Sequence, residues 1–167
     1  DEVRQDPAFR RTGESRDGCR VPVPWSGDVP PYGFGPADCG LAWLPSPATW
    51  AALSVSAQTG DPTSTLELYR AALRLRREHP ALAGGDETIT WLETEPGLLA
   101  FTRVSGTAGG TTGAGDLVCA VNLSGAPVRI DGYGQPLLAS EPLPETAAGV
   151  PVLPVDTAVW FEAPQGG

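Results

Sequence analysis

The hydrophobic period of this chain changes at Pro80, and no other feature constrains its fold as strongly. Over residues 62–79, apolar side chains recur at the spacing of an α-helix. The pattern ends at His79-Pro80, because the residue before a proline disfavours the helical conformation. Beyond Pro80, apolar and polar residues alternate, which is typical of strands. We therefore expect two domains, residues 1–80 and residues 81–167.

Capping signals mark the start of the expected helix. Asp61 is expected to be its N-cap, with Pro62 at the first helical position, and Ser64 with Glu67 fits a capping box. The apolar positions cover well over half of the helix circumference. We therefore expect this helix to be covered on two sides by separate bodies.

Arg76 falls inside the apolar arc of this helix. If that face is buried, the guanidinium needs a carboxylate or carbonyl partner. We interpret Arg76 as a structural anchor between domains rather than as a catalytic residue. The remaining arginines of the helix are interspersed with glutamates and predict a solvated face.

The segments after Pro80 predict an antiparallel β-sandwich. Residues 88–92 and 98–104 read as strands separated by a turn at Glu95-Pro96-Gly97. Further short strands are expected at residues 117–122, 128–130, weakly at 137–138, at 152–153 and at 158–161. Short strands at this spacing, joined by Gly and Pro turns, favour a sandwich. The Gly/Thr-rich stretch at residues 105–115 lacks the Gly-Lys-Ser/Thr ending of a phosphate loop.

Residues 1–60 show little periodicity and are rich in proline and aromatic residues, as in residues 30–36 and 43–47. So long a segment without its own secondary structure suggests a functional loop laid over another body. The sequence contains no methionine and opens at Asp1. We therefore expect a piece of a longer polypeptide, with that other body largely outside this chain.

One loop of this segment carries the main candidate binding residues. Residues 15–25 read Ser-Arg-Asp-Gly-Cys-Arg-Val-Pro-Val-Pro-Trp, with no helix or strand period. The charged groups of Arg16, Asp17 and Arg20 can bond to hydroxyl groups, and Trp25 offers an aromatic wall. This chemistry suits the rim of a pocket for a neutral polyhydroxylated ligand. A salt-bridged surface loop explains the same residues equally well.

Several function classes are excluded by composition. A net charge of −9 without a basic stripe argues against a nucleic-acid partner. His79 is the single histidine, and its position favours a charged imidazole at a helix end over a catalytic triad or a zinc ligand. No acidic pair lies where a barrel enzyme would place its catalytic carboxylates. We expect no catalytic centre, metal or cofactor in this chain.

The three cysteines lack metal-type spacing. Cys119 lies in an apolar run and should be a buried small hydrophobe. A disulfide between Cys19 and Cys39 stays open, but reduced thiols in a cytoplasmic protein are our expectation. No apolar run approaches the length of a membrane span, and no signal peptide is visible, so we expect no membrane partner.

The order of motifs resembles the C-terminal portion of an α-glucosidase of glycoside hydrolase family 13, the α-amylase superfamily. The resemblance rests on Arg-Asp-Gly-Cys-Arg-Val-Pro-Val-Pro-Trp at residues 16–25, Trp-Leu-Pro at 43–45, Gln58, Asp-Pro-Thr-Ser-Thr-Leu at 61–66, Tyr-Arg at 69–70 and Leu-Arg-Arg-Glu-His-Pro-Ala-Leu at 75–82. It is nearest to the branch that includes oligo-1,6-glucosidases and trehalose synthases. The whole chain is covered, and the first and last of these motifs are the specific ones.

The resemblance implies an α+β fragment: the end of a (β/α)₈ barrel followed by an all-β C-terminal domain. Residues 1–60 would follow the eighth barrel strand, and the helix over 62–79 would be the last barrel helix. Arg16, Asp17 and Arg20 would then lie near the substrate, with Trp25 as a supporting wall. The sequence Val-Pro-Val-Pro-Trp at 21–25 departs from the family's commoner Thr-Pro-Met-Gln-Trp.

The family's nucleophilic aspartate, general-acid glutamate and second aspartate would all precede Asp1. The implied parent is a retaining glycosidase for short α-linked glucosides, completed by the missing barrel, and this chain alone should not catalyse. Two alternatives stay open. One is a transglucosylating or isomerising relative such as trehalose synthase. The other is a carbohydrate-binding β-sandwich module, although Trp91 and Trp160 sit among apolar neighbours and suggest core positions.

Overall fold

In the computed structural model, which describes most of the chain, the protein forms two compact units, residues 1–67 and 68–167. The described residues are 20–36, 38–40, 42, 44, 46–83, 89–105, 115–146 and 149–164. The division falls within the long helix α3 rather than at Pro80. The assignment of residues 1–80 and 81–167 to separate domains stays a prediction.

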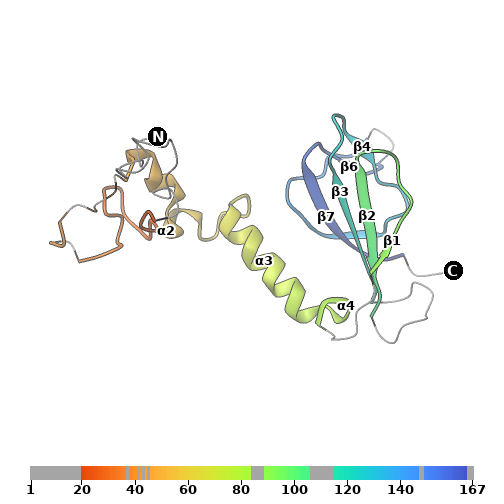
Figure 1. Ribbon diagram of the computed structural model, residues 1–167, viewed down its shortest axis with the longest axis horizontal. Helices are drawn as coiled ribbons and strands as arrows, with labels where there is room; N and C mark the ends of the chain where they lie inside the picture. Colours follow the sequence, from red (N-terminus) through yellow and green to blue (C-terminus); the bar gives the residue numbers. More distant parts are fainter. Residues whose placement is uncertain are drawn as a thin grey trace, which may run out of the picture. The chain divides into compact units, whose positions relative to one another are not determined.

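The first unit contains short helical turns and loops. A 3₁₀ helix, η2, spans Ala48–Leu53, and a single α-helical turn, α2, spans Val55–Gln58 (Figure 1). Ser54 is buried and caps α2, because its hydroxyl accepts a hydrogen bond from the Ala57 amide at 3.2 Å. The described part of residues 20–60 thus carries little regular structure, as its sequence predicts.

Helix α3 spans Thr65–Glu78, so it begins three residues later than predicted. Ser64 is the N-cap, and its hydroxyl accepts from the Glu67 amide at 3.2 Å. The Glu67 carboxylate turns to the Gly60 amide, at 3.0 Å, instead of closing the capping box on Ser64. The prediction that Asp61 is the N-cap is wrong. Its carboxylate bonds to the amide and hydroxyl of Thr63, forming a turn ahead of the helix, and these bonds lower the pKa of Asp61.

The helix ends at Glu78, as the proline predicts. A further helical turn, α4, which the sequence does not predict, follows over Pro80–Ala83. No side chain of α3 is buried, and Tyr69 and Leu73 are among its exposed residues. Arg76 is exposed as well. The two covering bodies and the partner that Arg76 would anchor stay predictions.

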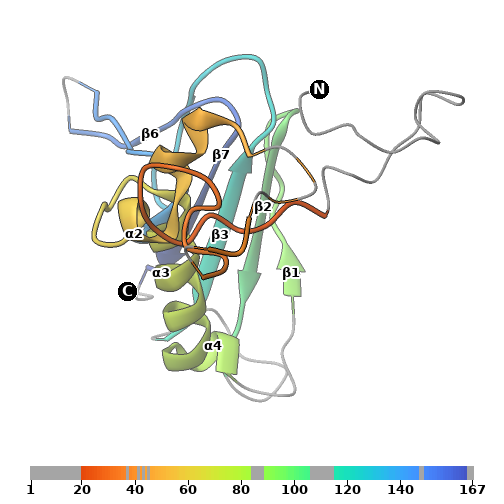
Figure 2. The same ribbon diagram turned by 90° about the vertical axis from the view of Figure 1, so that its left-hand side faces the viewer.

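The described part of the second unit contains seven strands at nearly the predicted positions. The strands are β1 (Ile89–Trp91), β2 (Leu98–Arg103), β3 (Leu117–Asn122), β4 (Val128–Arg129), β5 (Gln135–Ala139), β6 (Val152–Leu153) and β7 (Thr157–Glu162). Five of them form an antiparallel sheet in the order β1-β2-β3-β7-β5, and β4 pairs with β6 (Figures 1 and 2). The expected antiparallel architecture is confirmed.

The hydrophobic core lies on one face of the five-stranded sheet. Alternate residues of β2, β3 and β7 point into it, and Ile130, just after β4, and Leu153 on β6 pack against them. Phe161 and Val159 are completely buried there. Burial of this apolar surface is the main stabilising contribution in the described part of the second unit.

The opposite face carries a row of aromatic rings. Phe101 on β2 lies 5.4 Å from Trp91 and 5.7 Å from Trp160, ring centre to ring centre, in edge-to-face contacts. The core position suggested for Trp91 is wrong, because its side chain is 64% exposed. β1 is the short edge strand (Figure 2), so the ring has a neighbouring strand on one side only. Trp160 lies on the interior strand β7 and is half-buried.

Candidate functional site

The segment from Arg20 to Trp25 is fixed by backbone hydrogen bonds at its C-terminal end. The amides of Trp25 and Ser26 both donate to the carbonyl oxygen of Tyr32, at 2.8 and 2.9 Å. The carbonyl oxygens of Pro24 and Trp25 accept from the first amides of α2, those of Val55 and Ser56, each at 2.9 Å. The carbonyl groups of Pro24 and Trp25 therefore join this segment to α2.

Tyr32 is the buried centre of this region. Its side chain is 1% exposed, and its hydroxyl donates to the carbonyl oxygen of Pro47 at 2.8 Å. Its backbone lies in the left-handed region, with φ of 51°, after a cis bond between Pro30 and Pro31. These contacts tie residues 25–32 to the segment that precedes η2.

A cavity of about 500 Å³ opens beside this segment. Its described lining residues are mainly apolar and come from three stretches: Arg20, Val21, Pro22 and Val23; Pro31, Phe34 and Gly35; and Cys39, Gly40, Ala42 and Leu44. Among these described residues, Arg20 carries the only charge. Apolar walls with one guanidinium donor suit a neutral ligand that presents both carbon faces and hydroxyl groups.

The predicted site residues do not all lie at the cavity. Arg20 lines the cavity, whereas Trp25 is half-exposed and is not among its lining residues. Arg16 and Asp17 lie outside the described residues. Arg76 lies on α3, in the other unit. The substrate-binding role of the first four residues and the anchoring role of Arg76 stay predictions.

Two residues of this region are not among the predicted site residues. Phe34 lines the cavity, and Tyr32 supports it through its hydrogen bond to Pro47. The run Pro-Pro-Tyr-Gly-Phe-Gly-Pro at residues 30–36 was a usable signal, because aromatic residues between turn residues are often exposed to a ligand.

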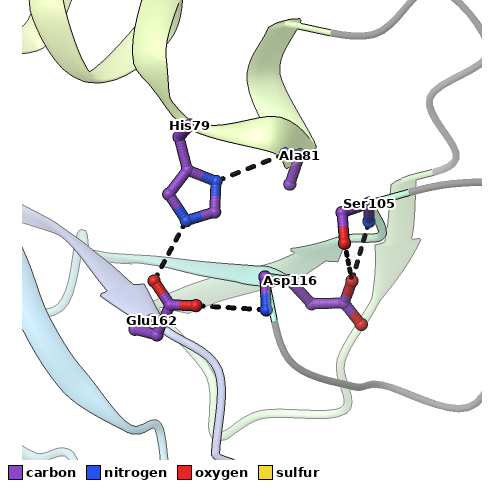
Figure 3. Close-up of polar contacts among 6 residues, drawn as sticks. His79, Ala81, Ser105, Asp116 and Glu162 are labelled. Atoms are coloured by element: carbon purple, nitrogen blue, oxygen red, sulfur yellow. Dashed lines mark hydrogen bonds and ion pairs between the residues drawn. The ribbon is translucent and has the colours of Figure 1, made fainter.

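A second polar cluster lies at one end of the β-sheet, in the other unit. The Nε2 atom of His79 lies 3.0 Å from the Glu162 carboxylate, and the Ala81 amide donates to Nδ1 at 3.3 Å (Figure 3). The expectation of a charged imidazole at this helix end stays a prediction. His79 directly follows Glu78, the last residue of α3, and its amide still donates to the Leu75 carbonyl oxygen at 2.9 Å.

Neither a metal centre nor a membrane span emerges from the part of the chain that the structure describes. No three His, Cys, Asp or Glu residues among the described ones are grouped closely enough to hold a metal ion. Within the same residues, no helix has both the length and the apolar character needed to cross a membrane.

The sequence is similar to several curated proteins over more than half of its length. It is 41% identical over 105 residues to a probable α-glucosidase of Rhizobium meliloti (strain 1021), an overlap of 61% of this chain and 18% of that protein. It is 36% identical over 122 residues to the trehalose synthase/amylase TreS of Mycobacterium tuberculosis (strain ATCC 25618 / H37Rv), an overlap of 70% and 19%. It is 29% identical over 93 residues to an oligo-1,6-glucosidase of Parageobacillus thermoglucosidasius, an overlap of 56% and 16%.

The predicted resemblance to glycoside hydrolase family 13 is confirmed. No protein-family model matches the chain. Among solved structures, Eubacterium rectale Amy13B resembles it with a TM-score of 0.52 at 18% identity, over 86% of this chain and 27% of that one. At that identity the likeness concerns the fold alone. The chain spans less than a fifth of the length of the three family 13 relatives above, so the activity of a whole protein is a matter for proposal.

Proposed function

We propose that this chain is the C-terminal portion of a retaining α-glucosidase that hydrolyses short α-linked glucosides. The observation that carries the proposal is the 41% identity to a probable α-glucosidase over 105 residues. Residues 1–80 would complete a catalytic (β/α)₈ barrel, and residues 81–167 would form the C-terminal β-sandwich domain. The antiparallel sheet with β4 and β6 packed on its core face supports the second assignment.

The catalytic carboxylates would be supplied by the part of the barrel that precedes this chain. In a retaining glycosidase, one carboxylate attacks the anomeric carbon while a second protonates the leaving oxygen, and water then releases the sugar. The cavity at Arg20 supports a binding role for this chain rather than a chemical one, because its described lining is apolar apart from one guanidinium. The chain alone would therefore be inactive.

Arg20 is the proposed substrate contact that the geometry supports best. A guanidinium on an apolar wall can donate hydrogen bonds to glucose hydroxyls while the wall contacts the carbon face of the ring. Arg16 and Asp17 would act beside it, and Trp25 would support the rim. The substrate is neutral, no cofactor is required, and we propose a cytoplasmic location without a nucleic-acid or membrane partner.

A transglucosylating or isomerising enzyme is the second candidate function. It is favoured by the 36% identity to trehalose synthase/amylase TreS, which extends over 122 residues. The two candidates share the glucosyl-enzyme step and differ in whether water or a sugar accepts the glucosyl group. The products therefore distinguish the two candidates, because they show whether water or a sugar accepts the glucosyl group.

The test uses the whole polypeptide that carries this sequence, incubated with maltose. Glucose as the main product supports the α-glucosidase, whereas trehalose as the main product supports the isomerising enzyme. If neither forms, both candidates are wrong. A glucan-affinity column then tests the carbohydrate-binding module, for which Trp91 offers an exposed aromatic side chain on the β-sheet.

The role of Arg20 is tested in the same protein by Arg20→Ala, with Arg129→Ala as the matched control. Arg129 is exposed on β4 and pairs only with the exposed Asp131 among the described residues, so its loss should leave activity unchanged. Loss of a charge-assisted hydrogen bond at Arg20 should lower kcat/KM roughly tenfold to a hundredfold. Equal kcat/KM values for the two variants would contradict a substrate contact at Arg20.

A further inference from the structure

His79 is buried at the corner between α3 and α4, where a titratable side chain is rarely placed without a partner. It is the single histidine of the sequence and is 9% exposed. Both ring nitrogens are engaged: Nε2 lies 3.0 Å from Oε2 of Glu162, and Nδ1 lies 3.3 Å from the amide nitrogen of Ala81 (Figure 3). The ring thus connects the last strand, β7, to the first turn of α4.

These two contacts fix where the imidazole proton lies. A backbone amide can only donate, so Nδ1 must accept from Ala81 and carry no proton. In the neutral ring the proton is then on Nε2, from which it is donated to the Glu162 carboxylate. The other oxygen of that carboxylate, Oε1, accepts from the Gly115 amide at 3.2 Å, so the acceptor is held in place.

Ala81 is held from its other side as well. Its side chain is fully buried, and its carbonyl oxygen accepts from Nε of Arg103 on β2 at 3.1 Å. The short segment from His79 to Ala81 therefore attaches the helical corner to the ends of β2 and β7 through hydrogen bonds.

We propose that the attachment of this helical corner to the β-sheet depends on the protonation state of His79. A proton taken from solvent at Nδ1 turns that atom from an acceptor into a donor, so the Ala81 amide loses its partner and α4 loosens. The Nε2–Glu162 contact persists as an ion pair, so the end of α3 remains attached. Acid thus releases one of the two attachments and keeps the other.

Charged groups of both signs lie near the ring. The Glu162 carboxylate on β7 faces Nε2, and Arg103 on β2 bonds to the Ala81 carbonyl oxygen. Asp116, just before β3, accepts from the amide and hydroxyl of Ser105 at 2.7 and 3.1 Å. Glu78 is exposed on the helix itself, and α4 contributes no charged side chain. The proposal depends on this geometry alone and not on the proposed glycosidase activity.

Two substitutions separate the two attachments. His79→Asn keeps an oxygen near the position of Nδ1, so it can still accept from the Ala81 amide, but it does not reach Glu162. His79→Gln keeps a donor near the position of Nε2 for Glu162 but offers no local acceptor to Ala81. Neither side chain titrates, so neither variant should show the acid effect.

The experiment is nuclear magnetic resonance on the untagged, ¹⁵N-labelled full chain, in which one histidine gives one pair of ring signals. At about pH 8 we expect the Nε2-protonated tautomer, and on acidification to about pH 5 a second ring proton. The protection factor of the Ala81 amide should fall roughly tenfold over the same range, while that of Ala120 in β3 stays constant.

In His79→Asn the protection of Ala81 should be independent of pH, and in His79→Gln it should be low throughout. An Nδ1-protonated ring at about pH 8 would overturn the proposal. So would an Ala81 amide whose protection does not change as the wild-type ring titrates. The wild-type measurement decides the question even if a variant does not fold.

Discussion

The side-chain amide of Asn122 donates to the carbonyl oxygen of Leu153 at 3.0 Å and thereby joins the five-stranded sheet to the β4–β6 pair. The same nitrogen lies 3.0 Å from the carbonyl oxygen of Pro154 and 2.9 Å from that of Ala126. Its Oδ1 atom accepts from the amide of Ser124 at 2.9 Å. Asn122 is completely buried, and its side chain bonds to polar groups of two chain segments, the turn at residues 124–126 and residues 153–154.

Asn122→Ala should lower the free energy of unfolding by about 3 kcal/mol, because it removes the hydrogen bonds of a completely buried side chain to the carbonyl oxygens of Leu153 and Pro154 and to the Ser124 amide. Urea denaturation followed by tryptophan fluorescence measures the change. Ser124→Ala is the matched control, since it removes only the local hydrogen bonds of the Ser124 hydroxyl, to Asn122 and Ala126, and should cost about 1 kcal/mol. Equal losses in the two variants would mean that the amide of Asn122 does not hold the two sheets together.

The sequence predicts the strands of the second unit well, because alternation and turn residues are local signals. The role of Asn122 in joining the two sheets is not predictable in this way, since Leu153 and Pro154 lie about thirty residues away and no local pattern encodes these contacts. The exposure of Trp91 likewise depends on β1 being an edge strand, which is a property of sheet order. The sequence predicts binding groups in the loop around Arg20 but not the cavity, because the hydrogen bonds of Tyr32 that shape the cavity leave no periodic pattern in the sequence.

Gly134 precedes β5, and its φ is +108°. A Cβ atom at this position would overlap the backbone carbonyl oxygen of Glu162, which cannot move without disturbing the β5–β7 pairing. Gly134→Ala should therefore destabilise the chain by about 4 kcal/mol, from overpacking and left-handed strain together.

Gly132→Ala is the control for that substitution. Gly132 also has a positive φ, +78°, but nothing lies within 4 Å of the added Cβ, so this variant measures strain alone. Its expected cost is about 1 kcal/mol in the same urea experiment. If the two alanine variants unfold at the same urea concentration, the predicted overlap with Glu162 is wrong.

Burial raises the pKa of the Cys119 thiol to about 11, whereas Cys39 is exposed. At about pH 8, iodoacetamide should therefore modify Cys119 roughly a hundredfold more slowly than Cys39, because the thiolate is the reactive form. Peptide mapping by mass spectrometry measures both rates, and a Cys19→Ser, Cys39→Ser chain isolates Cys119. Fast modification of Cys119 in that chain would contradict its burial.

The same shift gives a pH dependence of stability. The folded chain keeps the Cys119 proton at pH values where the unfolded chain, with a pKa near 9, has lost it. The stabilisation is complete below pH 9 and is lost as the pH rises towards about 11. Cys119→Ala should remove this part of the alkaline destabilisation, which urea titrations at several alkaline pH values would detect.

The two units should differ in stability when the chain is studied by itself. The buried core cluster lies entirely in the second unit, between Leu98 and Ala163. In the described part of the first unit, the buried side chains are Tyr32, Leu44 and Ser54. Amides of β2, β3 and β7 should therefore exchange roughly a thousandfold or more slowly, relative to their intrinsic rates, than amides of residues 20–60. Hydrogen exchange with mass spectrometry on the full chain measures this ratio, and uniform protection across both units would show that residues 20–60 are stable without a further body to cover them.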